Sequence, residues 1–245
     1  MSIIELHIAI TQHNLCHENS SKPQSVVDVL NGACCLSKSS LKQAINKGAL
    51  WLSRDKRTKR LRRLKTPLNI NDELHFYYND EVLAQPIPKA ELIADFTDYS
   101  VWYKPYGMLS QGSKWSDHCT ITRFVERFFE NNRACFIVHR LDRAATGLII
   151  VAHGKKSTKA LTAMFEAHNF NKYYQIIVAG DFSSSPSPLI INTPIDDKKS
   201  LSIFNFNAFD ASSNSSLIDV KIETGRKHQI RKHAASINFP VIGDR

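Results

Sequence analysis

Apolar residues follow helical spacing and then strand spacing in the first third of the chain. Helical spacing predicts short helices over residues 25–31 and 37–48, and the second ends at a glycine suited to a left-handed stop. Strand-like apolar clusters follow over residues 49–53 and 73–78. We therefore expect a small α/β unit with its core at about residues 25–80.

The remainder of the chain is dominated by strand patterns. Five apolar runs predict strands, at residues 136–141, 147–153, 173–180, 204–209 and 217–223. In the last run, Ile218, Val220 and Ile222 alternate with charged residues, as expected for a strand with one buried face. These runs indicate a mostly antiparallel, mixed sheet, so the fold class is α+β with a small α/β domain at the N-terminus.

Two helices are expected among these strands. The segment 157–170 has a helical pattern, and Ser157 is placed to cap it. Near the end of the chain, Ile230, Ala234 and Ile237 mark one face of a helix that stops before Asn238. A linker containing two prolines, at residues 86–88, separates an N-terminal domain, 1–85, from a second domain, 92–245.

Composition excludes several classes of protein. The 245 residues are 42% hydrophobic, and no apolar run approaches the length of a membrane helix. The first ten residues lack the basic flank of an export signal. The five cysteines include no C-x-x-C pair, which argues against a disulfide framework and a thiolate zinc site. We therefore expect a cytoplasmic protein, with reduced thiols and no membrane association.

Positive charge is concentrated in the N-terminal domain. The chain carries a net charge of +9, and residues 38–65 alone contain eleven basic residues and one acidic residue. A block this dense favours contact with nucleic acid over an ordinary solvated surface. The residues expected to contact RNA phosphates are Lys42, Arg57, Arg60, Arg62 and Arg63.

Three segments of the second domain carry polar residues that folding alone explains poorly. They are H-R-L-D-R-A-A-T-G (139–147), N-K-Y-Y-Q-I-I-V-A-G (171–180) and T-G-R-K-H-Q-I-R-K-H (224–233). In the first segment, charged residues follow the end of a predicted strand. In the second segment, a lysine and two tyrosines begin a predicted strand. A solvated loop and an aromatic packed on the sheet are the ordinary alternatives for these two segments.

Together the segments resemble the motifs of the RluA-type pseudouridine synthase family, which isomerises uridine in structured RNA. The family patterns are H-R-L-D, K-x-Y-x-x-x-V-x-G and T-G-R-x-H-Q-I-R-x-H followed by G-D, and they occur here in order over about 105 residues. The segment W-Y-K-P-Y-G-M-L-S-Q (102–111) matches the K-P-x-G that opens the same domain. Residues 37–52 and P-L-N-I-N-D-E-L (67–74) resemble an alpha-L RNA-binding module, with Asn71 in place of a turn glycine.

The resemblance implies a role for each site residue. Asp142 would be the catalytic carboxylate, as nucleophile or as proton acceptor; Arg231 would be its permanent cationic partner, and Tyr174 would stack on the flipped uridine. The residues implied to bind the substrate are Arg140, His139, Lys172, Arg226, His228 and Ile230. For Ile230, an ordinary core position is an equally good interpretation. No cofactor and no metal are implied, and we expect a monomer whose partner is rRNA or tRNA.

Two departures from the family pattern stand out. Ala145 and Thr146 occupy positions where the family has Thr and Ser, while Gly147 is kept, so we expect a retuned loop and retained activity. The chain ends at Arg245, just after G-D, where relatives continue, so we expect the second domain to be truncated at its C-terminus.

Other functions fit less well. His228 and His233 are five residues apart and cannot share one ion from a single helix face, and His13, Cys16 and His17 lack a second ligand pair. A glycosidase needs two carboxylates, and the motifs offer one. The main alternative is a non-catalytic RNA-binding or ribosome-assembly protein on the same fold.

Overall fold

The computed structural model describes residues 2–15, 24–167 and 169–243. The chain divides into two compact units. Unit 1 comprises Met1–Asp95 and Ser100–Val151, and unit 2 comprises Phe96–Tyr99 and Ala152–Arg245. The domain boundary near residues 85–92 stays a prediction, because the N-terminal sheet and the segment up to Val151 cluster together in one unit.

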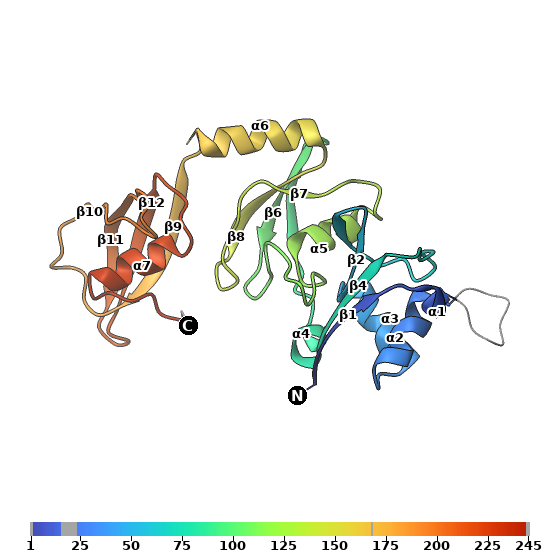
Figure 1. Cartoon of the computed structure of the whole chain (residues 1–245). Helices are drawn as coiled ribbons and strands as arrows, with labels where there is room; N and C mark the ends of the chain where they lie inside the picture. The colour runs from blue at the N-terminus through green and yellow to red at the C-terminus, as the bar shows by residue number, and fades with distance from the viewer. Residues whose placement is uncertain (1, 16–23, 168, 244–245) are drawn as a thin grey trace. The chain divides into compact units, whose positions relative to one another are not determined.

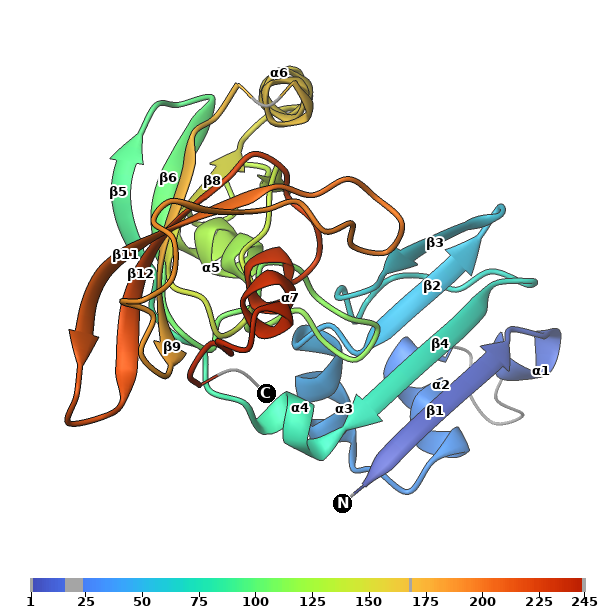
Figure 2. The same ribbon diagram turned by 90° about the vertical axis from the view of Figure 1, so that its left-hand side faces the viewer.

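The first part of unit 1 is a four-stranded antiparallel sheet with two helices on one face (Figures 1 and 2). Its strands, in the spatial order β1-β4-β2-β3, are β1 (Ile3–Ala9), β4 (Glu73–Asn79), β2 (Leu50–Arg54) and β3 (Arg57–Arg60). The helices are α2 (Val26–Ala33) and α3 (Lys38–Asn46), and two short helices are α1 (Gln12–Leu15) and α4 (Asp80–Ala84). The predicted helices and strands of this module are confirmed, whereas β1 and β3 were not predicted.

Local sequence signals explain why these helices begin and end where they do. The Ser25 side chain accepts a hydrogen bond from the Asp28 N–H, and the Asp28 carboxylate accepts one from the Ser25 N–H. Ser37 caps α3 in the same way. Gly48 and Asn71 both have positive φ, as their sequence contexts predicted. Apolar residues of both helices, including Leu30 and Ile45, are fully buried against the sheet.

A second sheet of four strands lies in the later part of unit 1. In the order β5-β6-β8-β7, its strands are β5 (Glu91–Asp95), β6 (Tyr99–Lys104), β8 (Gly147–Ala152) and β7 (Phe136–Ile137). Helix α5 (Ile121–Phe128) begins at the Thr120 cap, and its Phe124 meets the buried Trp102 of β6 edge to face. The predicted strand over 136–141 is shorter than expected, because the chain leaves the sheet after Ile137.

Unit 2 contains an antiparallel sheet in the order β10-β11-β12-β9 (Figure 1). Its strands are β9 (Lys172–Ala179), β10 (Leu189–Ile191), β11 (Ser202–Asp210) and β12 (Ser215–Ile222), and its helices are α6 (Lys155–Glu166) and α7 (Gln229–Ser236). Ile218, Val220 and Ile222 are buried, which confirms the predicted alternation along β12. Ala234 of α7 belongs to the same core.

One predicted helix cap is wrong. Helix α6 begins after Gly154, and its N-cap makes no side-chain hydrogen bond. The Ser157 hydroxyl donates to the Gly154 carbonyl from inside the first turn, 3.0 Å away. Ser157 therefore binds back to the helix backbone and does not satisfy a free N–H.

No helix in residues 2–15, 24–167 and 169–243 is long and apolar enough to cross a membrane.

Candidate active site

Asp142 lies in the loop between β7 and β8, on backbone that a buried serine holds. The Ser110 hydroxyl donates to the Leu141 carbonyl at 2.7 Å and accepts from the Leu141 N–H at 3.0 Å. Both Ser110 and Leu141 are buried, whereas Asp142 is half-buried and Arg140 is exposed. The loop therefore presents Asp142 from a fixed backbone, as a catalytic carboxylate requires.

Two further contacts hold the same loop. The His139 Nε2 atom accepts a hydrogen bond from the Ile150 N–H of β8 at 3.0 Å, and the Gly107 N–H donates to the Arg143 carbonyl at 2.9 Å. His139 of the H-R-L-D motif therefore has a structural role, because its hydrogen bond with Ile150 holds the loop on β8. Gly147 has φ +125°, so the glycine kept beside the altered Ala145 is required by the backbone.

Lys104 of β6 is a buried lysine whose charge interacts with that of Asp142. Its side chain is fully buried, and its ammonium donates to the carbonyls of Met108 at 2.8 Å and Pro105 at 3.2 Å. Burial lowers the pKa of Lys104 to about 8, and the charge of Asp142 opposes that shift. The list of expected site residues omitted Lys104, although the K-P-Y-G segment contained it.

Strand β9 of unit 2 begins with Lys172 and carries Tyr174 on the same face. Tyr174 pairs with Val220 of β12 and packs partly against the core of unit 2. The pKa of Lys172 is lowered, mainly by burial; Glu223 opposes this shift and Arg226 adds to it. Lys172 and Tyr174 therefore combine a partly desolvated cation with an aromatic ring.

The buried side chain of Gln229 organises the turn before α7. Its Oε1 accepts from the Thr224 hydroxyl at 2.7 Å and from the Arg226 N–H at 3.0 Å. Its Nε2 donates to the Leu201 carbonyl at 3.0 Å and to the Ser202 hydroxyl at 2.9 Å. Four hydrogen bonds from one amide explain why this turn needs a glutamine in particular.

His233, the last residue of the same motif, is also a structural residue. It is buried, with Nδ1 2.9 Å from the Ser202 hydroxyl and Nε2 3.0 Å from both the Ser200 hydroxyl and the Thr193 carbonyl. These contacts join α7 to β11 and to the loop before it.

The remaining predicted residues of unit 2 cluster around the start of α7. His228 is the N-cap of the helix in a left-handed conformation, with φ 55°. The Arg226 Nε donates to the Lys199 carbonyl at 2.9 Å. Arg231 is half-buried on α7, and Ile230 packs against the core of unit 2, as its alternative interpretation proposed.

The predicted site residues thus form two groups. Asp142, with His139 and Arg140, belongs to unit 1, whereas Tyr174 and Arg231, with Lys172, Arg226, His228 and Ile230, belong to unit 2. The structure gives the internal geometry of each group. The pairing of Asp142 with Arg231 stays a prediction.

The five predicted RNA-binding residues fall into two sets. Lys42, Arg57 and Arg63 are exposed. Arg60 and Arg62 are half-buried and form ion pairs with Asp117. Arg60 and Arg62 therefore join the basic module to the loop that carries Asp117.

Other contacts strengthen this junction within unit 1. The Trp51 indole donates to the Lys114 carbonyl at 3.0 Å, the Ser116 hydroxyl donates to the Lys47 carbonyl at 2.9 Å, and Arg60 stacks over Trp51. Burial lowers the pKa of Arg60, and Asp117 opposes this shift. Part of the basic block is therefore structural.

These features define an α+β protein. It has an aspartate loop held by backbone hydrogen bonds and, in the other unit, a helix positioned by a buried glutamine. The family model described as RNA pseudouridylate synthase matches residues 98–236, more than half of the chain. The chain belongs to this family. The match includes the Asp142 loop, β9 and α7.

Curated relatives carry the same family name. A protein of Chloroflexus aurantiacus called "Uncharacterized RNA pseudouridine synthase" is 32% identical over 44% of this chain and 37% of its own length. The "Ribosomal large subunit pseudouridine synthase D" of Borreliella burgdorferi is 28% identical over 74% of this chain and 63% of its own length. The chain thus spans less than two thirds of the length of these relatives.

Solved structures show the same fold. Human RNA Pseudouridylate Synthase Domain Containing 1 aligns with a TM-score of 0.52 and 21% identity, over 65% of this chain and 71% of that one. Human RNA Pseudouridylate Synthase Domain Containing 4 gives a TM-score of 0.51 and 19% identity, over 63% and 67%.

Proposed function

We propose that this chain isomerises uridine to pseudouridine in structured RNA, with Asp142 as the catalytic carboxylate. The observation that carries the proposal is the rigid Asp142 loop, held by Ser110 and influenced by the buried Lys104, inside a family-matched region. Relatives named for the ribosomal large subunit make its rRNA the first candidate substrate, with tRNA as the second. We further propose that the chain acts as a cytoplasmic monomer.

The reaction conserves every atom of the uridine. The bond from N1 of the base to C1′ of the sugar breaks, the base rotates, and a new bond joins C5 to C1′. The hydrogen on C5 moves to N1, so the reaction needs no oxidant and no phosphate donor. Asp142 takes part either by adding to the sugar or by accepting a sugar proton, and both roles need its ionised form.

We propose one cation from each unit as a partner of Asp142. Lys104 supplies a positive charge from within unit 1, and it is held in place by two backbone carbonyls. Arg231 carries a guanidinium that cannot lose its proton at neutral pH, and we propose it as the cationic partner of Asp142.

The substrate uridine must leave its stack before it can react. This step costs a few kcal/mol, and an aromatic ring recovers part of that cost by stacking on the flipped base. Tyr174 serves as that ring, while the exposed Arg140 contacts the phosphates beside the flipped nucleotide.

One experiment, run on two RNA substrates, tests the proposal. Purified protein is incubated with transcribed large-subunit rRNA and with tRNA, and pseudouridine is then mapped position by position with a base-selective chemical adduct. We expect one or a few new positions, in rRNA more than in tRNA. RNA binding without any new pseudouridine would support the non-catalytic RNA-binding alternative.

A further inference from the structure

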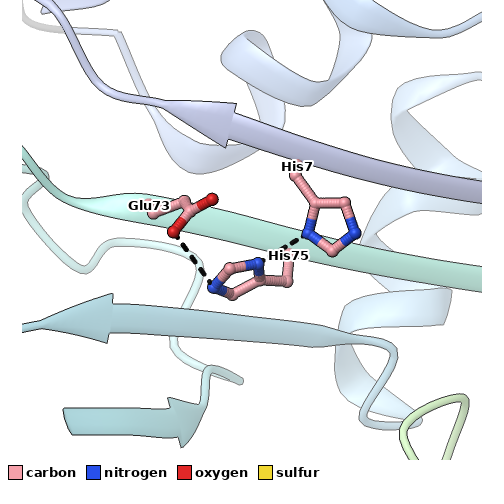
Figure 3. Close-up of side chains that lie close together, drawn as sticks. All are labelled: His7, Glu73 and His75. Carbon is pink, nitrogen blue, oxygen red and sulfur yellow. Dashed lines mark hydrogen bonds and ion pairs between the residues drawn. The ribbon is translucent and has the colours of Figure 1, made fainter. Parts of the chain in front are cut away.

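Two histidines face each other on the sheet of the N-terminal module. His7 of β1 and His75 of β4 are directly paired across the sheet, and their Nδ1 atoms are 2.7 Å apart (Figure 3). They lie on the face opposite to α2 and α3, because Leu74 and Phe76 on either side of His75 are buried in the core beneath.

The outer nitrogen of each ring has an oxygen partner. The Nε2 of His7 is 3.6 Å from a Glu5 carboxylate oxygen. The Nε2 of His75 is 2.8 Å from the Ser53 hydroxyl and 3.7 Å from a Glu73 carboxylate oxygen. A carboxylate close to each Nε2 favours a hydrogen on that atom, and in this tautomer the Ser53 hydroxyl accepts from His75. The two Nδ1 atoms then face each other with their lone pairs.

Opposed lone pairs at this distance repel unless something positive lies between them. A single shared hydrogen can satisfy the pair. A metal ion can do so as well, and metal-binding histidines commonly have an oxygen partner on the other ring nitrogen, which fixes the tautomer. Glu5 and Ser53 provide that arrangement here.

We propose that His7, His75 and Glu73 bind one divalent transition-metal ion of the zinc class. Their potential ligand atoms all lie within 4.8 Å of one another (Figure 3). Two imidazoles and one carboxylate suit zinc, nickel or copper, whereas magnesium and calcium prefer oxygen ligands alone. A water molecule would complete a tetrahedral site.

The required rearrangement is small. Tetrahedral zinc with bonds of about 2.0–2.1 Å places its ligand atoms about 3.3 Å apart. The two rings would therefore separate slightly from their present 2.7 Å. Glu73 lies beside the Nε2 of His75, and its side chain, which is 48% exposed, would turn to the Nδ1 side to become the third ligand.

Neighbouring charges set the conditions for binding. Lys114 contacts both carboxylate oxygens of Glu5 at 2.8 Å and lies over the ring of Tyr77. Lys114 thus holds the Glu5 carboxylate beside His7.

The ion would join strands that are distant in the sequence. His7 and His75 are 68 positions apart, and β1 occupies the edge of its sheet. Metal binding would therefore hold the edge strand on the module and stabilise its folded state.

The test uses the untagged chain after removal of metals with a chelator. Co²⁺ is titrated and followed by its visible absorption, and Zn²⁺ is then used to displace it. We expect one ion per chain and a higher melting temperature in Zn²⁺. His7→Gln and His75→Gln should each weaken binding at least about tenfold, and Ser53→Ala should weaken it by about tenfold through loss of ring orientation.

A matched control separates this site from the other histidines near the start of the chain. The double variant His13→Gln/His17→Gln should bind Zn²⁺ as the parent does; His17 lies outside the described residues. Imidazole ¹⁵N spectra of the unaltered chain should show that Zn²⁺ moves the Nδ1 signals of His7 and His75, a result that needs no variant to fold.

Two results would overturn the proposal. If no saturable binding occurs, the two rings share only a hydrogen. If binding survives in His7→Gln, or is lost in the His13/His17 control, the ion binds elsewhere. Neither result depends on whether the chain isomerises uridine.

Discussion

Individual side chains around Asp142 fix the backbone of its loop and add a buried cation to unit 1. Ser110 fixes the backbone of the preceding residue, His139 fastens the loop to β8, and Lys104 adds a buried positive charge. A lysine buried among carbonyls stabilises the fold poorly. Its position beside the Asp142 loop is therefore better explained by function than by packing.

Replacing that lysine by a residue of similar length should separate stability from activity. Lys104→Met should keep or raise the melting temperature at pH 7, because it removes a buried charge. The single-turnover rate should fall at least about tenfold, since the loss of a buried charge that interacts with Asp142 costs more than about 1 kcal/mol. Activity equal to that of the parent would show that Lys104 does not support Asp142.

The same residue predicts a pH dependence of stability. Its folded-state pKa of about 8 lies below the ordinary value of 10.5, so the unfolded chain binds the proton more tightly. The free energy of unfolding should therefore gain a rising contribution between about pH 8 and 10.5. Denaturant unfolding across this range should show that rise in the parent and not in Lys104→Met.

Tyr174 should act through its ring and not through its hydroxyl. Tyr174→Phe keeps the stacking face and should retain most activity, whereas Tyr174→Leu should lose about 1–3 kcal/mol in the base-flipped complex. Single-turnover rates with a uridine-containing RNA measure the difference, and thermal melts control for the packing of Tyr174 on the core of unit 2. A Leu variant that reacts like the parent would assign Tyr174 to that core.

At the scale of elements, the motif T-G-R-K-H-Q-I-R-K-H serves two purposes. Gln229 and His233 hold α7 on β11 and the preceding loop through buried hydrogen bonds. Arg231 lies between them in sequence on the same helix. The motif thus combines Gln229 and His233, which position the helix, with Arg231, the predicted site residue that the helix carries.

The four hydrogen bonds of the Gln229 side chain predict that its loss lowers the free energy of unfolding. Gln229→Leu should destabilise the protein by at least about 1–3 kcal/mol, because it leaves buried backbone and hydroxyl groups without partners. Gln175→Leu is the matched control, since Gln175 is exposed on β9 and makes one hydrogen bond, to Asp219. Urea unfolding of both variants gives the comparison, and equal losses would contradict this role of Gln229.

The sequence predicted these elements unevenly. Helices α2, α3 and α7 were predictable because apolar spacing and end signals agreed, as at Ser25 and Gly48. The cap at Ser157 was mispredicted, because a serine inside a first turn can bind its own helix backbone. The motifs pointed to Asp142 and Arg231, but spacing alone could not distinguish the structural roles of Gln229 and His233 from a substrate-binding role.

At the scale of the whole molecule, the basic block divides between folding and RNA binding. Arg60 and Arg62 pair with Asp117, a contact between residues far apart in sequence that no local pattern reveals. Lys42, Arg57 and Arg63 are exposed and remain the candidates for phosphate contact.

Salt dependence of RNA binding should distinguish the two sets. Replacing Lys42, Arg57 and Arg63 by Ala should weaken binding and flatten the log-log salt dependence, by roughly 0.7–0.9 per lost phosphate contact. Arg62→Ala should instead lower the melting temperature, because it leaves Asp117 with fewer partners, and should change the salt slope little. Unchanged affinity and slope in the triple variant would make the exposed set an ordinary solvated surface.

The most direct test of the central claim is the substitution Asp142→Asn. Asparagine is nearly isosteric with aspartate, but it cannot serve as a useful nucleophile or base at this position. We predict that the variant folds and binds RNA like the parent, while single-turnover formation of pseudouridine falls by at least about a thousandfold. A folded Asp142→Asn variant that forms pseudouridine at an appreciable rate would contradict the account.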